Sequence, residues 1–247
     1  MSAIIGPRDM DHIFQNDLMS FTERVFYELF PQSAFSMAPH LELMAAKLSA
    51  CLAGRGPKRL IINLPPRSLK SIMVSVASVA WLLGRHPNKQ IICASYGQDL
   101  ADKHARDTRT VMTSAFYQRL FPVTRLSQSK LSVNDFMTTQ QGFRMATSVG
   151  GVLTGRGADL IIIDDPLKPE DALSDSRRSA NREAGSIWIT NSVSLFARFR
   201  IRSEWRSDRD RSHDTHVPPR ARLSVRAFRA GTVKRIQFAA FYGPFEL

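Results

Sequence analysis

Three short runs of aliphatic residues constrain the fold of this chain more than any other feature. They are LIINL at 60–64, QIICASY at 90–96 and LIIIDD at 160–165. Short runs that are rich in β-branched residues and bounded by turn-forming residues predict strands buried on both faces. Helical patterns follow the first two runs, at 72–84 and 97–114. Because buried strands alternate with helices in parallel sheets, the sequence predicts an α/β fold with a mainly parallel sheet.

The remaining segments add helices and a hairpin to this frame. Apolar spacing predicts one helix over 9–30 and another over 40–53. Residues 135–148 are typical of a β-hairpin, and the glycine-rich segment 151–159 predicts a loop. One more helix is predicted over 174–188.

Composition places the chain among globular proteins, since 43% of its 247 residues are apolar and 23% are charged. No apolar run approaches the ~20 residues of a membrane-spanning helix, and the N-terminus shows no secretory signal. Two cysteines, Cys51 and Cys93, are too few for a disulfide scaffold or a four-cysteine zinc site. We expect both to be buried, in a protein of the reducing cytoplasm.

The net charge of +12 favours a polyanionic partner, nucleic acid above all. The excess is uneven along the chain. Residues 190–247 hold 12 basic and 5 acidic residues, and Lys234 is their single lysine. This Arg-rich segment shows no clear period and no apolar strand, so it differs in kind from residues 1–189.

The first apolar strand leads into PPRSLKS at 65–71, which has features of a phosphate-binding loop. Such a loop needs backbone N–H groups and a helix N-terminus, a lysine for the phosphates and a hydroxyl for Mg²⁺. Lys70 and Ser71 stand where the helix would begin. Leu64 and Leu69 occupy the two places where the common phosphate-loop pattern has glycine.

The run LIIIDD places two carboxylates, Asp164 and Asp165, at the carboxyl end of a buried strand. This matches the Walker B requirement, in which one carboxylate holds Mg²⁺ and the next orients the attacking water. An alternative is that they cap a following helix with Pro166 at its first position. Adjacent buried carboxylates are costly without a cation, which favours the functional interpretation.

Together these segments resemble the ATPase domain of the large terminase subunits of tailed phages. The resemblance rests on LIINLPPRSLKS, WLLGRHPNKQIICASYGQDLADKHARDTR and GGVLTGRGADLIIIDDP, in this order, and runs from about 35 to about 183. It implies a P-loop NTPase-like fold of the ASCE type. That fold is a three-layer sandwich with a mainly parallel sheet, expected here to be incomplete at its C-terminal side.

The resemblance also assigns roles to individual residues. It implies that ATP is bound by the loop residues Pro66, Arg67, Ser68, Leu69, Lys70 and Ser71. Ser71 and Asp164 would bind Mg²⁺, and Asp165 would be catalytic, although the family commonly has Glu there. Arg67 could steady the γ-phosphate, and Arg156 could act as an arginine finger on the nucleotide of a neighbouring subunit. The alternative for Arg156 is a solvent-facing loop residue.

The tail departs from this family. In the family, Walker B is followed by a helix, an apolar strand, a coupling motif and an RNase H-like nuclease. Residues 206–216, RSDRDRSHDTH, can be back-translated so that reading one base later gives alternating Ile and Val. We therefore expect 190–247 to be a frameshift product and the nuclease to be absent. A genuine basic arm that binds nucleic acid is the alternative.

The sequence thus predicts an N-terminal helical segment at 1–34, a terminase-like ATPase domain at 35–189 and an atypical tail at 190–247. The resemblance implies ATP-driven translocation of double-stranded DNA into a procapsid, in the cytoplasm of a phage-infected or prophage-carrying host. Implied partners are DNA, the portal, the small terminase subunit and copies of the chain in a ring, with no membrane. The alternatives are a stand-alone helicase-like P-loop ATPase and a non-enzymatic basic remnant that binds nucleic acid.

Overall fold

The structure is a computed structural model that describes residues 6–57, 59–64, 67–151, 157–167, 176, 193–199 and 233–237. Its helices are α1 (Pro7–Asn16), α2 (Leu18–Leu29), α3 (Pro39–Leu52), the π-helix η1 (Ile72–Ala77), α4 (Ser78–Arg85), α5 (Gln98–Thr113) and α6 (Ala115–Leu120). Its strands are β1 (Arg59–Leu64), β2 (Gln90–Ser95), β3 (Leu126–Leu131), β4 (Asp135–Thr138), β5 (Phe143–Ser148), β6 (Leu160–Asp164), β7 (Val193–Phe199) and β8 (Val233–Gln237).

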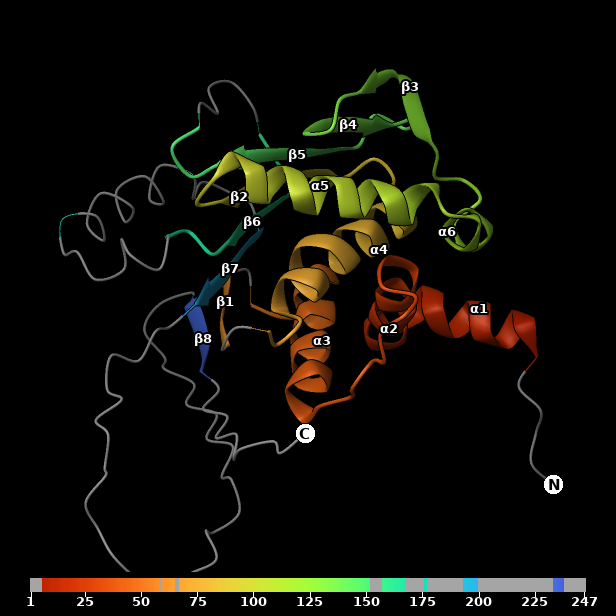
Figure 1. Ribbon diagram of the computed structural model, residues 1–247, viewed down its shortest axis with the longest axis horizontal. Coiled ribbons are helices and arrows are strands. Elements are labelled where there is room, and N and C mark those ends of the chain that lie inside the picture. Colours follow the sequence, from red (N-terminus) through yellow and green to blue (C-terminus); the bar gives the residue numbers. More distant parts are fainter. Residues whose placement is uncertain are drawn as a thin grey trace, which may run out of the picture.

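The described strands form one eight-stranded sheet in the order β3-β4-β5-β2-β6-β7-β1-β8 (Figure 1). The pairs from β5 to β8 are all parallel, whereas β3, β4 and β5 pair antiparallel. The predicted α/β class, the mainly parallel sheet and the hairpin over 135–148 are therefore confirmed. A single strand, β7, lies between β1 and β6, which is the order of the predicted ASCE type.

The strand β7 corrects one expectation from the sequence. No apolar strand was expected after LIIIDD, yet Val193–Phe199 pairs with β6 on one side and with β1 on the other. Val233–Gln237 adds β8 beside β1. Five of the seven residues of β7, VSLFARF, are apolar, so a local strand pattern is present within the Arg-rich segment and was overlooked. Part of the segment predicted as a separate tail thus belongs to the same sheet.

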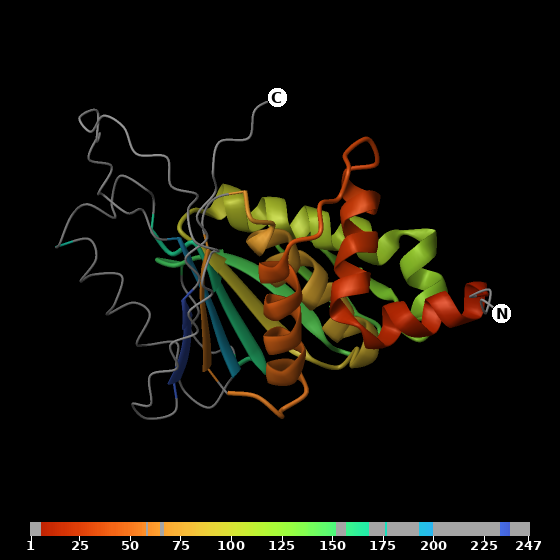
Figure 2. The same cartoon turned by 90° about the horizontal axis from the view of Figure 1, so that it is seen from below.

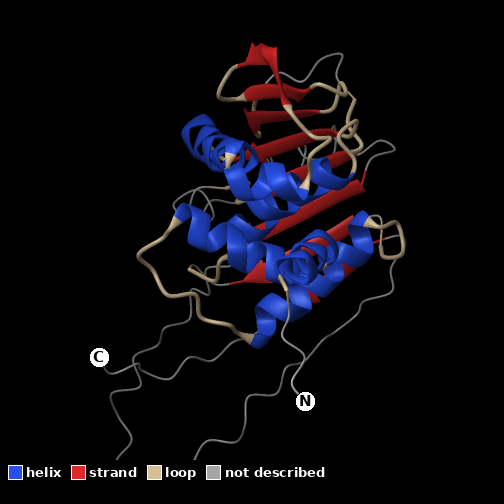
Figure 3. Ribbon diagram, turned by 90° about the vertical axis from the view of Figure 1, so that its right-hand side faces the viewer, coloured by secondary structure: helices blue, strands red, loops and turns tan. Residues whose placement is uncertain are grey.

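The described helices cover one face of this sheet (Figures 2 and 3). Side chains of α2, α3, η1, α4 and α6 form one apolar core with alternate residues of β1, β2 and β6. A smaller cluster on the opposite face contains Ile92, Ala94, Val149, Ile161 and Ile163, and no described helix contributes to it. The helix predicted over 174–188 lies outside the described residues apart from Ser176.

The N-terminal helix predicted over 9–30 is divided in two at Asp17. This residue has extended backbone angles, with φ −115° and ψ 112°, and its carboxylate accepts a hydrogen bond of 2.7 Å from the Ser20 N–H. Apolar periodicity continues across the break because both helices pack on the same core. An Asp at a helix N-cap satisfies an otherwise unpaired N–H group, which stabilises the new start.

The helix predicted over 72–84 is present and mostly buried, but it begins as a π-helix. The first six residues form η1, and the Ser78 N–H donates to the Met73 carbonyl five residues earlier. The remaining turns, α4, are α-helical. Stretches of π-helix are rare and occur frequently at functional sites. This one directly follows the predicted phosphate loop.

The predicted burial of the two cysteines is confirmed, since Cys51 and Cys93 are both buried, and both are free thiols. Burial raises the pKa of the Cys51 thiol to about 11. Within the described part of the chain, no helix has the length and apolar character needed to cross a bilayer.

A buried arginine lies under α5. Arg144 of β5 is fully buried, and its three guanidinium nitrogens have no hydrogen-bond partner within the described part of the chain. Burial lowers the pKa of Arg144, and the nearby Asp102 and Asp107 oppose this effect. A buried charge without hydrogen bonds is strongly unfavourable.

We therefore expect Arg144→Met to raise the free energy of unfolding by about 1–4 kcal/mol, because it removes an uncompensated charge and keeps apolar volume. Urea unfolding followed by circular dichroism measures this change. Arg106→Met on the exposed side of α5 is the control and should stay within about 0.5 kcal/mol of the unmodified chain. A destabilised Arg144→Met variant would show that the guanidinium has a stabilising partner in solution.

Candidate active site

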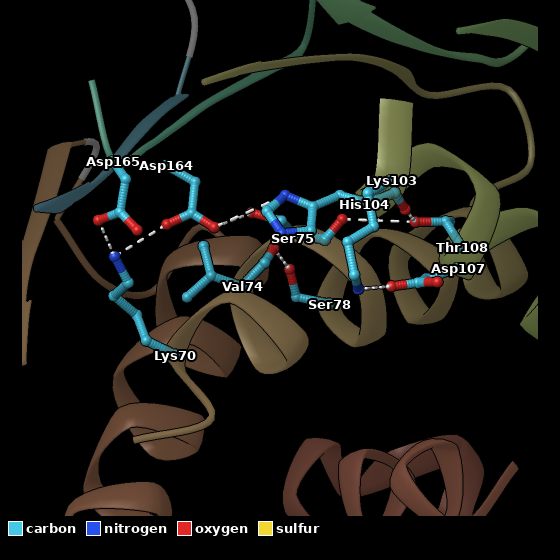
Figure 4. Close-up of polar contacts among 10 residues, drawn as sticks. All are labelled: Lys70, Val74, Ser75, Ser78, Lys103, His104, Asp107, Thr108, Asp164 and Asp165. Carbon is cyan, nitrogen blue, oxygen red and sulfur yellow. Dashed lines mark hydrogen bonds and ion pairs between the residues drawn. The ribbon is translucent and has the colours of Figure 1, made fainter. Parts of the chain in front are cut away.

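The two sequence motifs meet at one edge of the sheet. Because β1 and β6 run parallel in the same sheet, the loop after β1 and the carboxylates after β6 leave at the same end. Ligands of open α/β sheets bind at this end. Figure 4 shows Lys70, at the start of the helical run after the loop, pointing toward Asp164 and Asp165.

Lys70 joins both carboxylates. Its Nζ lies 3.0 Å from Oδ1 of Asp164 and donates a hydrogen bond to Oδ1 of Asp165. Lys70 and Asp164 are buried, whereas the Asp165 side chain is 24% exposed. One ammonium faces two carboxylates, so the cluster retains a negative charge that a cation would complement.

The loop that carries Lys70 has an alternating backbone. Arg67 and Leu69 have φ values of 58° and 56°, in the left-handed region, and Ser68 between them does not. Alternation of this kind turns successive N–H groups toward one point and creates an anion-binding concavity. Leu69 thus adopts the conformation that glycine takes without strain, at the place where the common motif has glycine.

A buried hydroxyl lies in the same loop. The Ser68 Oγ is enclosed and makes no hydrogen bond within the described part of the chain. His40 at the start of α3 approaches the loop, with Nε2 3.4 Å from the Ser68 carbonyl oxygen. An unpaired polar atom in an anion-binding loop fits a site built for a polar ligand.

The end of β6 is fixed by its neighbour β2. Asp165 has a φ of 48°, and its carbonyl accepts a hydrogen bond of 3.0 Å from the Tyr96 N–H. This contact lies one residue beyond the last strand pair, Ser95 with Asp164. The Ser95-Tyr96 segment, one of the motifs that carry the family resemblance, therefore fixes the backbone of Asp165.

Two residues in contact with Asp164 were missed from the sequence. The Ser75 hydroxyl donates a hydrogen bond of 2.8 Å to Oδ2 of Asp164. His104 of α5 has its Nδ1 3.9 Å from the same oxygen. Burial lowers the pKa of His104, an effect that Asp164 opposes. The position of Ser75, one helical turn after Ser71, was the available signal.

The other predicted site residues either make no hydrogen bond or ion pair with Lys70, Asp164 or Asp165 in the part of the chain that the structure describes, or lie outside that part. Ser71 makes no side-chain hydrogen bond within the described ranges, and Arg67 is exposed. Pro66 and Arg156 lie outside the described residues. No group of three or more His, Cys, Asp or Glu residues is gathered for a metal among the described residues. Mg²⁺ needs no such cage, since it is commonly bound by one or two carboxylates, substrate phosphates and water.

Comparisons with known proteins give structural similarities only. No protein-family model matches the chain, and no curated protein matches it in sequence. Among solved structures, the HK97 bacteriophage large terminase is 17% identical with a TM-score of 0.43, over 72% of this chain and 37% of that one. The ATPase domain of the Thermus phage P74-26 large terminase, a point mutant, is 18% identical with a TM-score of 0.42, over 73% and 70%. The chain thus spans about a third of the HK97 protein.

The ion pairs of Lys70 predict a stability effect. Lys70→Met leaves the buried Asp164 carboxylate without its cation, which should lower the free energy of unfolding by about 3–5 kcal/mol. Adding Asp164→Asn should recover much of this loss, because the buried charge is then removed as well. Lys103→Met breaks an exposed pair with Asp107 and should cost under about 1 kcal/mol. Urea unfolding measures the free energy of unfolding of the unmodified chain, the two lysine variants and the double variant. An equal loss of stability in Lys70→Met and Lys103→Met would contradict the buried pair.

The left-handed backbone of Leu69 predicts that glycine at this position is more stable than alanine, the reverse of their order in a helix. Leu69→Gly and Leu69→Ala both lose the packing of the side chain against the core. Because φ is 56°, the glycine variant should be the more stable one by about 1 kcal/mol. At an ordinary helical position such as Ala45, glycine is instead less stable than alanine by a similar amount. Thermal unfolding of Leu69→Gly, Leu69→Ala and Ala45→Gly tests this, and a less stable Leu69→Gly would refute the left-handed conformation.

Proposed function

We propose that this chain is the ATPase portion of a phage DNA-packaging terminase large subunit, which uses ATP hydrolysis to translocate double-stranded DNA. The observation that carries the proposal is the contact of Lys70 with Asp164 and Asp165. This contact joins the phosphate-type loop after β1 to two carboxylates at the end of β6. The strand β7 lies between β1 and β6 in the sheet. The order of the sequence motifs supplies the family, and with it the assignment to DNA packaging.

The loop binds the phosphates of ATP in this proposal. The alternating φ values of Arg67, Ser68 and Leu69 direct backbone N–H groups to one side, and the helical run begins at Lys70. Lys70 supplies the charge for the β- and γ-phosphates. The unpaired Ser68 hydroxyl is a further donor for a phosphate oxygen.

The carboxylates fit Mg²⁺, which would neutralise phosphate charge when it is bound. Asp164 and the Ser71 hydroxyl would hold it, since carboxylate and hydroxyl oxygens are the ligands that this hard cation prefers. Asp164 is buried and fixed, as a metal ligand needs to be. Asp165 is the more exposed carboxylate, so it has access to water and would orient the attacking molecule.

The partners follow from the resemblance and the charge. A net charge of +12 suits a chain that contacts DNA through phosphates, without sequence preference and with a steep dependence on salt. In this proposal copies of the chain form a ring on the portal, with the small subunit as a further partner, in the cytoplasm of the host. Arg156 would reach the nucleotide of a neighbouring copy.

The test is ATP hydrolysis by the purified full chain. We expect Mg²⁺-dependent phosphate release, and we expect Asp165→Asn to lower kcat at least about 100-fold because it removes the group that orients water. The Kd for ATP should change by less than about threefold. Asp159→Asn, at the other end of β6 in a surface pair with Lys89, is the matched control and should keep its turnover.

Three outcomes would contradict the proposal. A folded chain that binds no ATP by calorimetry has no nucleotide site. Unchanged turnover in Asp165→Asn removes its catalytic role. Turnover that DNA stimulates, in a chain that binds neither procapsids nor portal, would favour a helicase-like ATPase instead.

A further inference from the structure

The carboxylate of Asp164 is held from two sides by different groups. The Ser75 hydroxyl donates to Oδ2 at 2.8 Å, and the Lys70 ammonium lies 3.0 Å from Oδ1 (Figure 4). All three side chains are buried. Oδ2 therefore accepts a hydrogen bond, whereas Oδ1 has the ion pair with Lys70 and accepts no hydrogen bond within the described residues.

These two partners differ in how the proposed function uses them. Lys70 is the phosphate-binding lysine, so a bound nucleotide draws its ammonium toward the phosphates. Oδ1 then loses its cation and faces the loop, where the metal would bind. Ser75 binds no phosphate in that proposal, and its bond to Oδ2 persists through the exchange.

We propose that Ser75 is the positioning residue of the nucleotide site, and that its hydroxyl holds Asp164 with Oδ1 aimed at the metal when Lys70 is engaged by phosphate. This inference rests on the proposed function and adds a residue to it. A hydrogen bond to the second oxygen of a metal-binding carboxylate fixes the orientation of the first.

Ser75 is itself well fixed for this role. It lies within the π-helix η1, where α5 packs against it. The Thr108 hydroxyl of α5 donates its proton to the His104 carbonyl at 2.7 Å, and its oxygen also lies 3.4 Å from the Ser75 carbonyl oxygen, so α5 contacts η1 at this point. The His104 ring nitrogen Nδ1 lies 3.9 Å from Oδ2, beyond hydrogen-bond distance, which leaves Ser75 as the donor to this oxygen among the described residues.

The experiment measures the Mg²⁺ concentration that gives half-maximal ATP hydrolysis in the full chain. We expect Ser75→Ala to raise it by about 10-fold or more, because second-sphere changes weaken metal binding by this factor. Binding of ATP in EDTA should change by less than about threefold, because Ser75 acts only on the metal ligand. Ser75→Cys, with a weak S–H donor of similar size, should share the shift.

Ser78→Ala is the matched control. Ser78 is a buried serine of the same helical run, and its hydroxyl donates to the Val74 carbonyl of its own helix. A loss of helix packing alone would affect the two alanine variants alike. The inference is overturned if Ser75→Ala and Ser75→Cys need no more Mg²⁺ than Ser78→Ala. If Ser75→Ala fails to fold, the Mg²⁺ requirement of Ser75→Cys is compared with that of Ser78→Ala, and this comparison alone tests the inference.

The failure of this inference differs from the failure of the proposed function. If the unmodified chain binds no ATP, the nucleotide site itself is wrong. If the chain hydrolyses ATP with Mg²⁺ and the Ser75 variants match the control, only the role of Ser75 is wrong.

Discussion

The ion pair between Lys70 and Asp164 is the interaction on which the arrangement of the site depends. A buried ammonium and a buried carboxylate are each unfavourable alone, and breaking such a pair is far more costly than breaking one on the surface. The pair therefore ties the loop after β1 to the end of β6, across the strand that separates them in the sheet. Asp165, Ser75 and the His104 ring each contact one of these two residues.

The second consequence of this pair is a chain of polar contacts that leads away from it. Asp164 accepts a hydrogen bond from Ser75 of η1, and His104 of α5 has its ring nitrogen Nδ1 3.9 Å from the same oxygen. Three elements that are distant in sequence thus share one buried carboxylate. Because a buried polar group without partners is expensive, such a network fixes its members in one arrangement. The helix after the phosphate loop and the helix over β2 and β5 are coupled to the site in this way.

The sequence predicted the elements whose own residues are apolar enough to indicate that they are buried. The strands β1, β2 and β6 are continuous apolar runs, so their type follows without tertiary information. The strand Val193–Phe199 was not predicted because the whole segment after residue 190 was interpreted as an Arg-rich tail, although VSLFARF is mostly apolar and pairs with β1 and β6. The break in the N-terminal helix at Asp17 was also missed, because the helical spacing of apolar residues continues through it. The frameshift interpretation of the tail stays a prediction.

For the site, the sequence alone determined the chemistry: a lysine after one strand and two aspartates after another, with an order of motifs that resembles one family. It could do so because strand ends in a parallel sheet meet at one edge, whatever the details of packing. Only the tertiary structure decided that Ser75 contacts Asp164 and that Leu69 adopts a left-handed backbone. Those features depend on how η1 and the loop sit on the sheet, and no local pattern of residues specifies a contact between segments about ninety residues apart.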